Sequence, residues 1–86
     1  MNLEMISIPL PLNDKLEIEL PEGTKAVRVF IENDVAYLEV MLGTGLPQKR
    51  KFITLPEFSP LEKNYRWIGW FKSSVGTFEC YEVIDL

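Results

Sequence analysis

The sequence predicts an all-β fold, a small antiparallel meander of about six to seven strands that closes into a barrel or a sandwich. Apolar and polar residues alternate along most of the chain, which is typical of strands with one buried face. No stretch of twelve residues has helical periodicity free of proline, glycine or clusters of β-branched residues. Most prolines fall between the alternating segments, where a missing N–H breaks no ladder of hydrogen bonds. The expected strands are residues 4–9, 15–20, 26–32, 35–42, 48–55, 65–72 and 77–84, and residues 1–86 are expected to form a single domain.

The central hairpin is expected to turn at Asn33-Asp34, because Asn and Asp tolerate positive φ better than most residues. Closing the hairpin there gives one apolar face and one face that holds an aromatic pair and a pair of opposite charges, which stabilise cross-strand neighbours. The expected apolar pairs are Ile31–Ala36, Val29–Leu38 and Val27–Val40, and the expected outer pairs are Phe30–Tyr37 and Arg28–Glu39.

A third strand is expected to continue this meander through the glycine-containing loop of residues 43–47. Pairing Leu42 with Gln48 sets Leu38 opposite Phe52 and Glu39 opposite Lys51. Val29, Leu38 and Phe52 then form a core row, and a register slip of one residue would scatter it between the faces.

The last hairpin is expected to turn at residues 73–76. Its predicted pairs are Phe71–Phe78 and Gly69–Cys80 on one face, and Trp70–Glu79 and Ile68–Tyr81 on the other. Both faces carry apolar groups, so one is expected to be the core and the other to be covered by a second layer, a subunit or a ligand.

Several short motifs resemble a family of short phage and prophage proteins that is known only as a domain of unknown function. The matching pieces are Ile6-Ser7-Ile8-Pro9, Leu20-Pro21-Glu22-Gly23-Thr24, Lys51-Phe52, Trp67-Ile68-Gly69 and Tyr81-Glu82-Val83. The chain departs from the family pattern at Leu55-Pro56-Glu57-Phe58, where the family has a Gly-Thr-Gly-His segment, and at Glu79, which stands in place of a histidine. Any role of those histidines therefore does not carry over to this chain.

Composition narrows the classes of function. The net charge is −4 and the pI about 4.7, which disfavours non-specific binding to nucleic acid. The single cysteine, Cys80, excludes an internal disulfide framework and suits a reducing compartment. The N-terminal residues lack the pattern of a signal peptide, and the apolar runs are too short to span a membrane. These features predict a cytoplasmic protein, in the host cytosol if a phage encodes it.

Catalysis and metal binding are not expected. The chain has no histidine, its serines have no base nearby in the sequence, and its three aspartates are far apart. The alternative is an enzyme whose active site is formed by Glu57, Glu62 and Glu79, if the fold brings these three carboxylates together. No catalytic residue, metal ligand or cofactor is predicted.

The candidate ligand-binding residues are Arg50, Lys49, Trp67 and Trp70. Arg50 falls on the core side of its strand near Val40, where its guanidinium could line the mouth of a pocket, whereas Lys49 and Lys51 face the other way. By alternation Trp67 and Trp70 point to opposite faces, and the outward one is a candidate interface anchor or base-stacking platform. The candidate interface residues of a homo-oligomer are Trp70, Ile68, Tyr81, Phe30 and Tyr37.

Two classes of function are consistent with these features. The resemblance implies a phage-type accessory protein, and small phage proteins often neutralise a host defence. In the first class the chain captures a host signalling nucleotide in pockets of a homo-oligomer, or blocks a host defence protein by surface contact. In the second it is a structural or assembly module of a virion or another complex.

Overall fold

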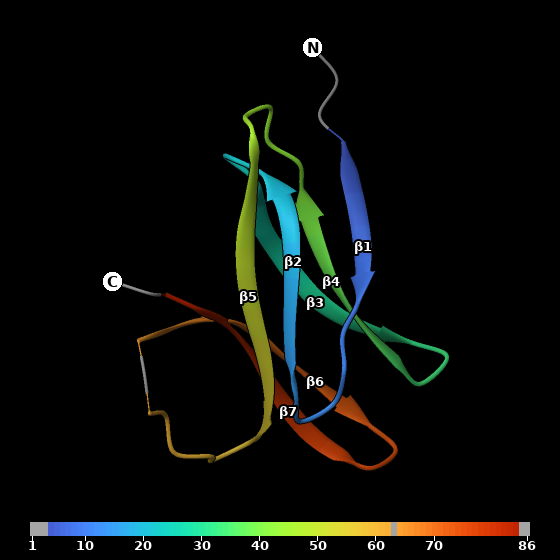
Figure 1. The fold of residues 1–86 in the computed structure, drawn as a ribbon. Coiled ribbons are helices and arrows are strands. Elements are labelled where there is room, and N and C mark those ends of the chain that lie inside the picture. Colours follow the sequence, from blue (N-terminus) through green and yellow to red (C-terminus); the bar gives the residue numbers. More distant parts are fainter. Residues whose placement is uncertain (1–3, 63, 85–86) are drawn as a thin grey trace.

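The computed structural model describes residues 4–62 and 64–84 and confirms the all-β prediction (Figure 1). Every pairing between its strands is antiparallel. None of the described residues forms a helix long and apolar enough to cross a membrane. The strands are β1 (Met5–Pro9), β2 (Lys15–Pro21), β3 (Lys25–Glu32), β4 (Val35–Met41), β5 (Pro47–Pro56), β6 (Tyr65–Ser73) and β7 (Gly76–Val83).

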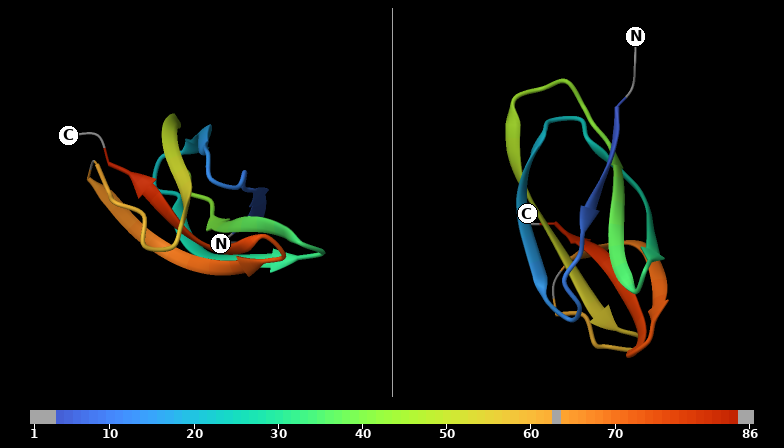
Figure 2. Two further views of the ribbon diagram at one scale, coloured as in Figure 1. Left: turned by 90° about the horizontal axis from the view of Figure 1, so that it is seen from below. Right: turned by 90° about the vertical axis from the view of Figure 1, so that its right-hand side faces the viewer.

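The strands form two sheets that pack as an open sandwich, and no barrel closes. The three-stranded sheet has the order β1-β4-β3, and the four-stranded sheet has the order β2-β5-β7-β6. In the right-hand view of Figure 2, β2 and β5 stand on one side and β3 and β4 on the other, with the β6–β7 hairpin across the lower end. The two sheets bury one core between them.

The predicted pairing of β4 with β5 is wrong, because the loop between them crosses from one sheet to the other. Gly43 lies against the β2–β3 turn so closely that a Cβ there would clash with the carbonyl oxygen of Glu22. The N–H of Glu22 donates to the carbonyl of Leu46 at 2.9 Å, and the N–H of Gly45 donates to the carbonyl of Glu22 at 3.1 Å. These contacts direct β5 to β2, so that Lys51 lies opposite Glu17 and not opposite Glu39.

The core nevertheless contains the residues that the alternation predicts. Leu38, Val40 and Phe52 are fully buried. Leu38 and Phe52 are not strand neighbours, however, but belong to opposite sheets. Val29 is partly buried and packs against this core.

Both predicted hairpins form, and each contains one β-bulge. The pairs Ile31–Ala36, Val29–Leu38, Phe30–Tyr37 and Arg28–Glu39 are confirmed, as are Phe71–Phe78, Gly69–Cys80 and Trp70–Glu79. The register shifts at Val27, so that Ala26 and not Val27 lies opposite Val40. It shifts again at Ile68, so that Trp67 and not Ile68 lies opposite Tyr81.

The bulge at Ile68 also overturns the prediction that Trp67 and Trp70 face opposite ways. An extra residue in a strand reverses the alternation beyond it. Trp67 pairs with Tyr81 and Trp70 pairs with Glu79, and these two partners are two residues apart on β7. Both indoles therefore lie on the outer face of the four-stranded sheet, where they are 55% and 61% exposed.

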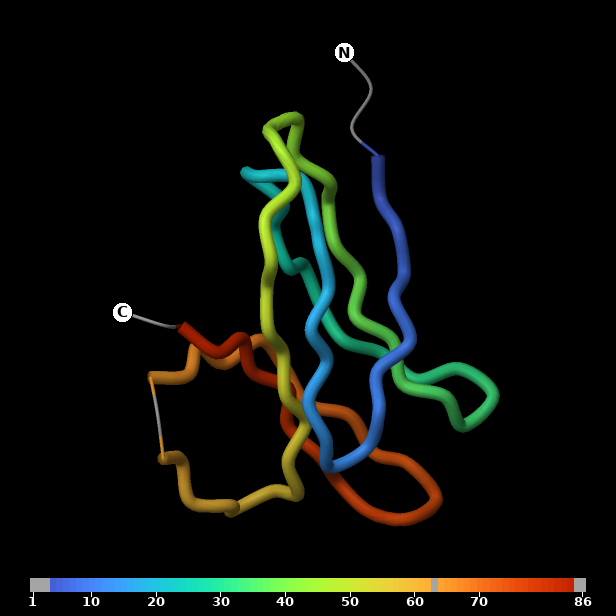
Figure 3. Tube along the Cα trace, viewed as in Figure 1, coloured from blue at the N-terminus to red at the C-terminus, as the bar shows by residue number. Residues whose placement is uncertain are grey.

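The sheets also meet along their edges and at the hairpin tips. The edge strands β3 and β6 approach so closely that a Cβ on Gly69 would lie 2.9 Å from a methyl group of Val29. At the tips, Asp34 accepts hydrogen bonds from the backbone N–H of Ser74 at 3.0 Å and from its hydroxyl at 2.5 Å. Figure 3 shows these two tips projecting in the same direction.

Candidate functional site

A hollow of about 400 Å³ opens between the first halves of the edge strands β3 and β6, and we call it the edge hollow. The two strands touch at Val29 and Gly69 and leave this space nearer to their beginnings. The bulge residue Ile68 lines this space, and the other bulge, at Val27, directly follows the lining residue Ala26. Bulges are common beside functional sites, because they re-aim side chains. The lining residues are Thr24, Lys25, Ala26, Arg50, Arg66, Trp67, Ile68 and Glu82.

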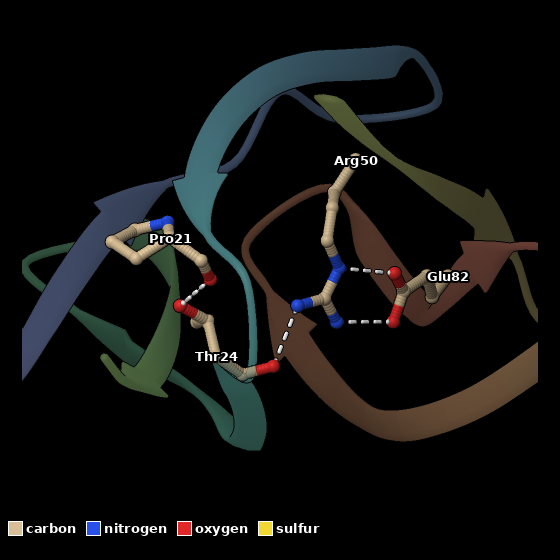
Figure 4. A network of polar contacts seen from close by, with 4 residues as sticks. All are labelled: Pro21, Thr24, Arg50 and Glu82. Atoms are coloured by element: carbon tan, nitrogen blue, oxygen red, sulfur yellow. Dashed lines mark hydrogen bonds and ion pairs between the residues drawn. The ribbon is translucent and has the colours of Figure 1, made fainter. Parts of the chain in front are cut away.

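The inner wall of the edge hollow is an ion pair between Arg50 of β5 and Glu82 of β7 (Figure 4). The guanidinium donates from Nε to Oε2 of Glu82 at 2.6 Å and from Nη2 to Oε1 at 2.7 Å. A third hydrogen bond runs from Nη1 to the backbone carbonyl of Thr24 at 2.5 Å. The side chains of Arg50 and Glu82 are only 13% and 9% exposed. The pair therefore joins the four-stranded sheet to the beginning of β3.

Arg50 lies on the core side of its strand, as the sequence predicts, but its guanidinium is engaged. The hydrogen bonds that Arg50 donates to Glu82 raise the pKa of Arg50 and outweigh the opposing effect of burial, and the charge of Glu82 raises it further. A guanidinium has five N–H groups, so two donors are left for another acceptor. Glu82 largely compensates the charge of Arg50. Arg50 therefore forms part of the wall of the edge hollow and contributes little to the positive potential there.

The positive charge of the edge hollow comes from Lys25 and Arg66. Arg66 lies directly opposite Glu82 in the ladder between β6 and β7, and so its side chain starts on the concave side of the sheet. Within residues 4–62 and 64–84, the side chains of Lys25 and Arg66 make no ion pair and no hydrogen bond. Both are exposed at the mouth of the hollow.

A second hollow, of about 530 Å³, adjoins the first and shares Arg50, Arg66 and Glu82 with it. It adds Lys49 and Lys51, and Lys49 approaches Glu17 at 3.7 Å. Five cationic residues thus line the two hollows in a protein whose net charge is −4, and of these Arg50 is paired with Glu82 and Lys49 approaches Glu17. Such a local concentration of positive charge attracts anions.

Trp67 completes the rim of the edge hollow. Its indole Nε1–H donates to Oε1 of Glu79 on the neighbouring strand β7 at 3.2 Å, which holds the ring on the outer face of the sheet. Trp67 is 55% exposed, so part of this residue is accessible from solvent at the rim.

The structure brings together two of the four predicted ligand-binding residues, Arg50 and Trp67, and places Lys49 in the adjoining hollow. Trp70 lies elsewhere on the outer face, beside Glu57 and Phe58. Sequence reasoning missed Lys25, Arg66 and Glu82. Alternation along β7 places Glu82 on the same side as Cys80, which is the core side. A carboxylate on the core side of one strand and Arg50 on the core side of another were the sequence signal that could have identified Glu82 as part of the site.

The predicted interface residues divide into two groups. Trp70 is exposed, and Phe30 stacks on Tyr37 with ring centroids 5.4 Å apart. Ile68 packs against the core, and Tyr81 is buried. Burial first, and then the charge of Glu79 and a hydrogen bond to it, raise the pKa of Tyr81.

Cys80 and the three glutamates considered for catalysis do not line the edge hollow. Burial and the charge of Glu82 raise the pKa of the Cys80 thiol to about 12, which leaves it protonated and unreactive near neutral pH. Glu57 and Glu79 line one surface hollow and Glu62 lines another. Comparison of the chain with family models, with curated proteins and with solved structures gave no match.

Proposed function

We propose that this protein is a non-catalytic binding protein that captures an anionic, phosphate-bearing small molecule in the edge hollow. The observation that carries the proposal is that Lys25 and Arg66, whose side chains have no partner in the part of the chain that the structure describes, lie at the mouth of a hollow that is also lined by Trp67. Phosphate oxygens accept charge-assisted hydrogen bonds from lysine and arginine, and an indole stacks on a nucleobase.

The size and electrostatics of the edge hollow support a nucleotide. Its volume of about 400 Å³ falls within the range of small-molecule sites. In our proposal Lys25 and Arg66 hold the phosphate, Trp67 stacks on the base, and the Arg50–Glu82 pair keeps the two walls apart at a fixed spacing. Arg66 suits this role because its planar guanidinium can hold a phosphate through two parallel hydrogen bonds.

The biological role that we propose is phage counter-defence, in which the protein sequesters a host signalling nucleotide. The resemblance to short phage and prophage proteins supports this role, and the edge hollow supports the choice of ligand. A protein inhibitor of a host defence component, or an accessory module of a virion or complex, would not need the edge hollow.

A homo-oligomer stays a prediction. Phe30 and Tyr37 stack on the outer face of the three-stranded sheet, where a second subunit could contact them. Ile68 packs against the core and Tyr81 is buried, so these two predicted interface residues are not accessible in the same way. Native mass spectrometry would count the subunits directly.

Calorimetric titration with a panel of cyclic and linear nucleotides tests the proposed function. We expect the parent protein to bind at least one of them, and Arg66→Gln and Lys25→Gln each to weaken binding by about tenfold, since each removes a charge-assisted contact. Lys72→Gln is the matched control, because Lys72 is exposed and lines neither of the two basic hollows. It changes the net charge by the same amount and should leave the affinity within about twofold of the parent.

Absence of binding by every nucleotide of the panel would contradict sequestration and leave surface contact with a protein as the better hypothesis. Equal losses in Arg66→Gln and Lys72→Gln would show that net charge, and not the edge hollow, attracts the anion.

A further inference from the structure

The outer surface near the turn of the β6–β7 hairpin carries a further hollow of about 370 Å³ with acidic and aromatic walls, which we call the aromatic hollow. It lies on the turn after β5 and on the outer face of the four-stranded sheet. Its lining residues are Glu57, Phe58, Trp70, Thr77 and Glu79.

Phe58 of this surface has a backbone conformation that is energetically unfavourable for a residue with a large side chain. It follows β5 in the turn of residues 56–59, which is closed by the N–H of Ser59 donating to the carbonyl of Pro56 at 3.2 Å. Its φ is 66°, a value that favours glycine and is unusual for a bulky residue. Its side chain is 92% exposed, so the ring gains almost nothing from packing in the isolated chain. Stability of the fold therefore does not account for a phenylalanine at this position.

The two carboxylates of the aromatic hollow lack cationic partners within residues 4–62 and 64–84. Glu79 is held in place by the indole N–H of Trp67, which donates to Oε1, and the hydroxyl of Tyr81, which donates to Oε2, each at 3.2 Å. The backbone N–H of Glu57 donates to the carbonyl of Thr77 at 3.0 Å, which ties its turn to β7. The surface thus presents two exposed aromatic side chains beside two carboxylates that have no cationic partner among the described residues.

We propose that the aromatic hollow binds an arginine side chain from a basic segment of a partner protein. A guanidinium is planar and stacks on the faces of aromatic rings, and it pairs with carboxylates through a fork of N–H groups. Phe58 and Trp70 supply the rings, and Glu57 and Glu79 supply the charge. A second copy of this chain is a poorer occupant, because each copy carries a net charge of −4 and the same two carboxylates. The aromatic hollow adjoins the edge hollow through the contact of Glu79 with Trp67 but shares no lining residue with it and takes a ligand of opposite charge, and so the inference goes beyond the proposed function.

Fluorescence anisotropy with a labelled peptide tests this inference. The probe is a nine-residue peptide in which two arginines stand among glycines and serines, and its control is the same peptide with citrulline, an uncharged analogue of the same shape. We expect the parent to bind the arginine peptide at least about tenfold more tightly, since both the cation–π contact and the ion pairs need the charge.

The variants separate the aromatic hollow from general attraction to an acidic protein. Glu57→Gln and Glu79→Gln should each weaken binding by about fivefold, whereas Glu62→Gln, which removes the same charge from a different hollow, should stay within about twofold. Phe58→Gly should weaken binding by about tenfold while its melting temperature equals or exceeds that of the parent, because glycine suits the backbone there. Loss of binding in that variant is then not a loss of folding.

Three results would overturn the inference. The first is equal affinity for the arginine and citrulline peptides, and the second is an equal loss in Glu62→Gln and Glu79→Gln. The third is a dimer of the parent in sedimentation that Phe58→Gly converts to monomer, since the occupant would then be a second copy of the chain.

Discussion

Arg50 and Glu82 form a buried pair in which each charge depends on the other. The guanidinium bridges Glu82 of β7 and the carbonyl of Thr24 at the beginning of β3. Breaking a buried pair by removing one partner is far more costly than replacing both, because the remaining charge has no compensation. The chief role of this arginine is therefore to hold the walls of the edge hollow, and Lys25 and Arg66 are better placed to bind the ligand.

Substitution of the pair tests this role. Arg50→Met should lower the free energy of unfolding by about 3–5 kcal/mol, because it leaves Glu82 buried without a partner. The double variant Arg50→Met, Glu82→Met should recover most of that loss, since it removes both charges and keeps the volume. Urea denaturation followed by circular dichroism measures both values. A loss of less than about 1 kcal/mol in the single variant is what a solvent-exposed ion pair contributes. Such a result would contradict the conclusion that Arg50 and Glu82 form a buried pair.

Residue identity alone predicted part of the candidate site. Alternation predicts Arg50 on the core side of its strand, and the structure confirms this. Alternation also predicts one outward tryptophan by placing Trp67 and Trp70 on opposite faces, whereas the bulge at Ile68 places both on the outer face. Lys25 and Arg66 could not be recognised, because their proximity depends on how the edges of two sheets meet. That contact needs Gly69 against Val29, and a glycine within a strand can equally mark a bulge or a tight bend.

At the scale of elements, the predicted registers of the two hairpins are correct between the turn and the β-bulge, and they are wrong beyond the bulge. The β3–β4 hairpin is correct from its turn to Arg28, and the β6–β7 hairpin is correct from its turn to Gly69. Val27 and Ile68 are apolar and β-branched, so nothing in the alternation marks them as extra residues. Ile68 lines the space between β3 and β6, and Val27 directly follows the lining residue Ala26. A regular register at Ile68 would have turned Trp67 toward the other face.

The wrong placement of β5 has a different physical cause. A strand with buried alternate residues can satisfy its apolar pattern beside either neighbour, and Phe52 is buried beside β2 as it would be beside β4. The choice is made by contacts of the loop with the β2–β3 turn, which include the N–H of Gly43 donating to the hydroxyl of Thr24 at 3.0 Å. Thr24 lies about twenty residues away in the chain, beyond the reach of a local pattern.

The contact between the two hairpin tips makes a prediction about acid stability. Hydrogen bonds from the hydroxyl and then the backbone N–H of Ser74 lower the pKa of Asp34 below its ordinary value of 3.8. A lowered pKa in the folded state means that the ionised form favours folding. The stabilisation is therefore fully present above about pH 4 and is lost as the pH falls through the lowered value.

Asp34→Asn removes the titrating group and keeps the turn, because asparagine also tolerates the φ of 61° at this position. Thermal melts between pH 2 and pH 7 should show the parent above the variant near neutral pH, with a difference that shrinks below about pH 4. A difference that is constant across this range would mean that Asp34 does not titrate against Ser74.

At the scale of the whole molecule, the charges are separated in space. A chain with a net charge of −4 gathers five cationic side chains around the edge hollow and its neighbour, and presents Glu57 and Glu79 on the outer face with two aromatic rings. This arrangement offers an anion and a cation separate places to bind. An open sandwich permits it, because the sheet edges are left available to form a hollow, whereas a closed barrel would have paired them.

The indole N–H signals of the two tryptophans in a ¹⁵N-labelled sample give the most direct test of anion capture in the edge hollow. Trp67 is at the rim of that hollow, and Trp70 lies in the aromatic hollow. Titration with the tightest-binding nucleotide of the calorimetric panel should shift the Trp67 signal in proportion to occupancy and leave the Trp70 signal in place. A shift of Trp70 alone, or no shift of either signal at saturation, would contradict binding in the edge hollow.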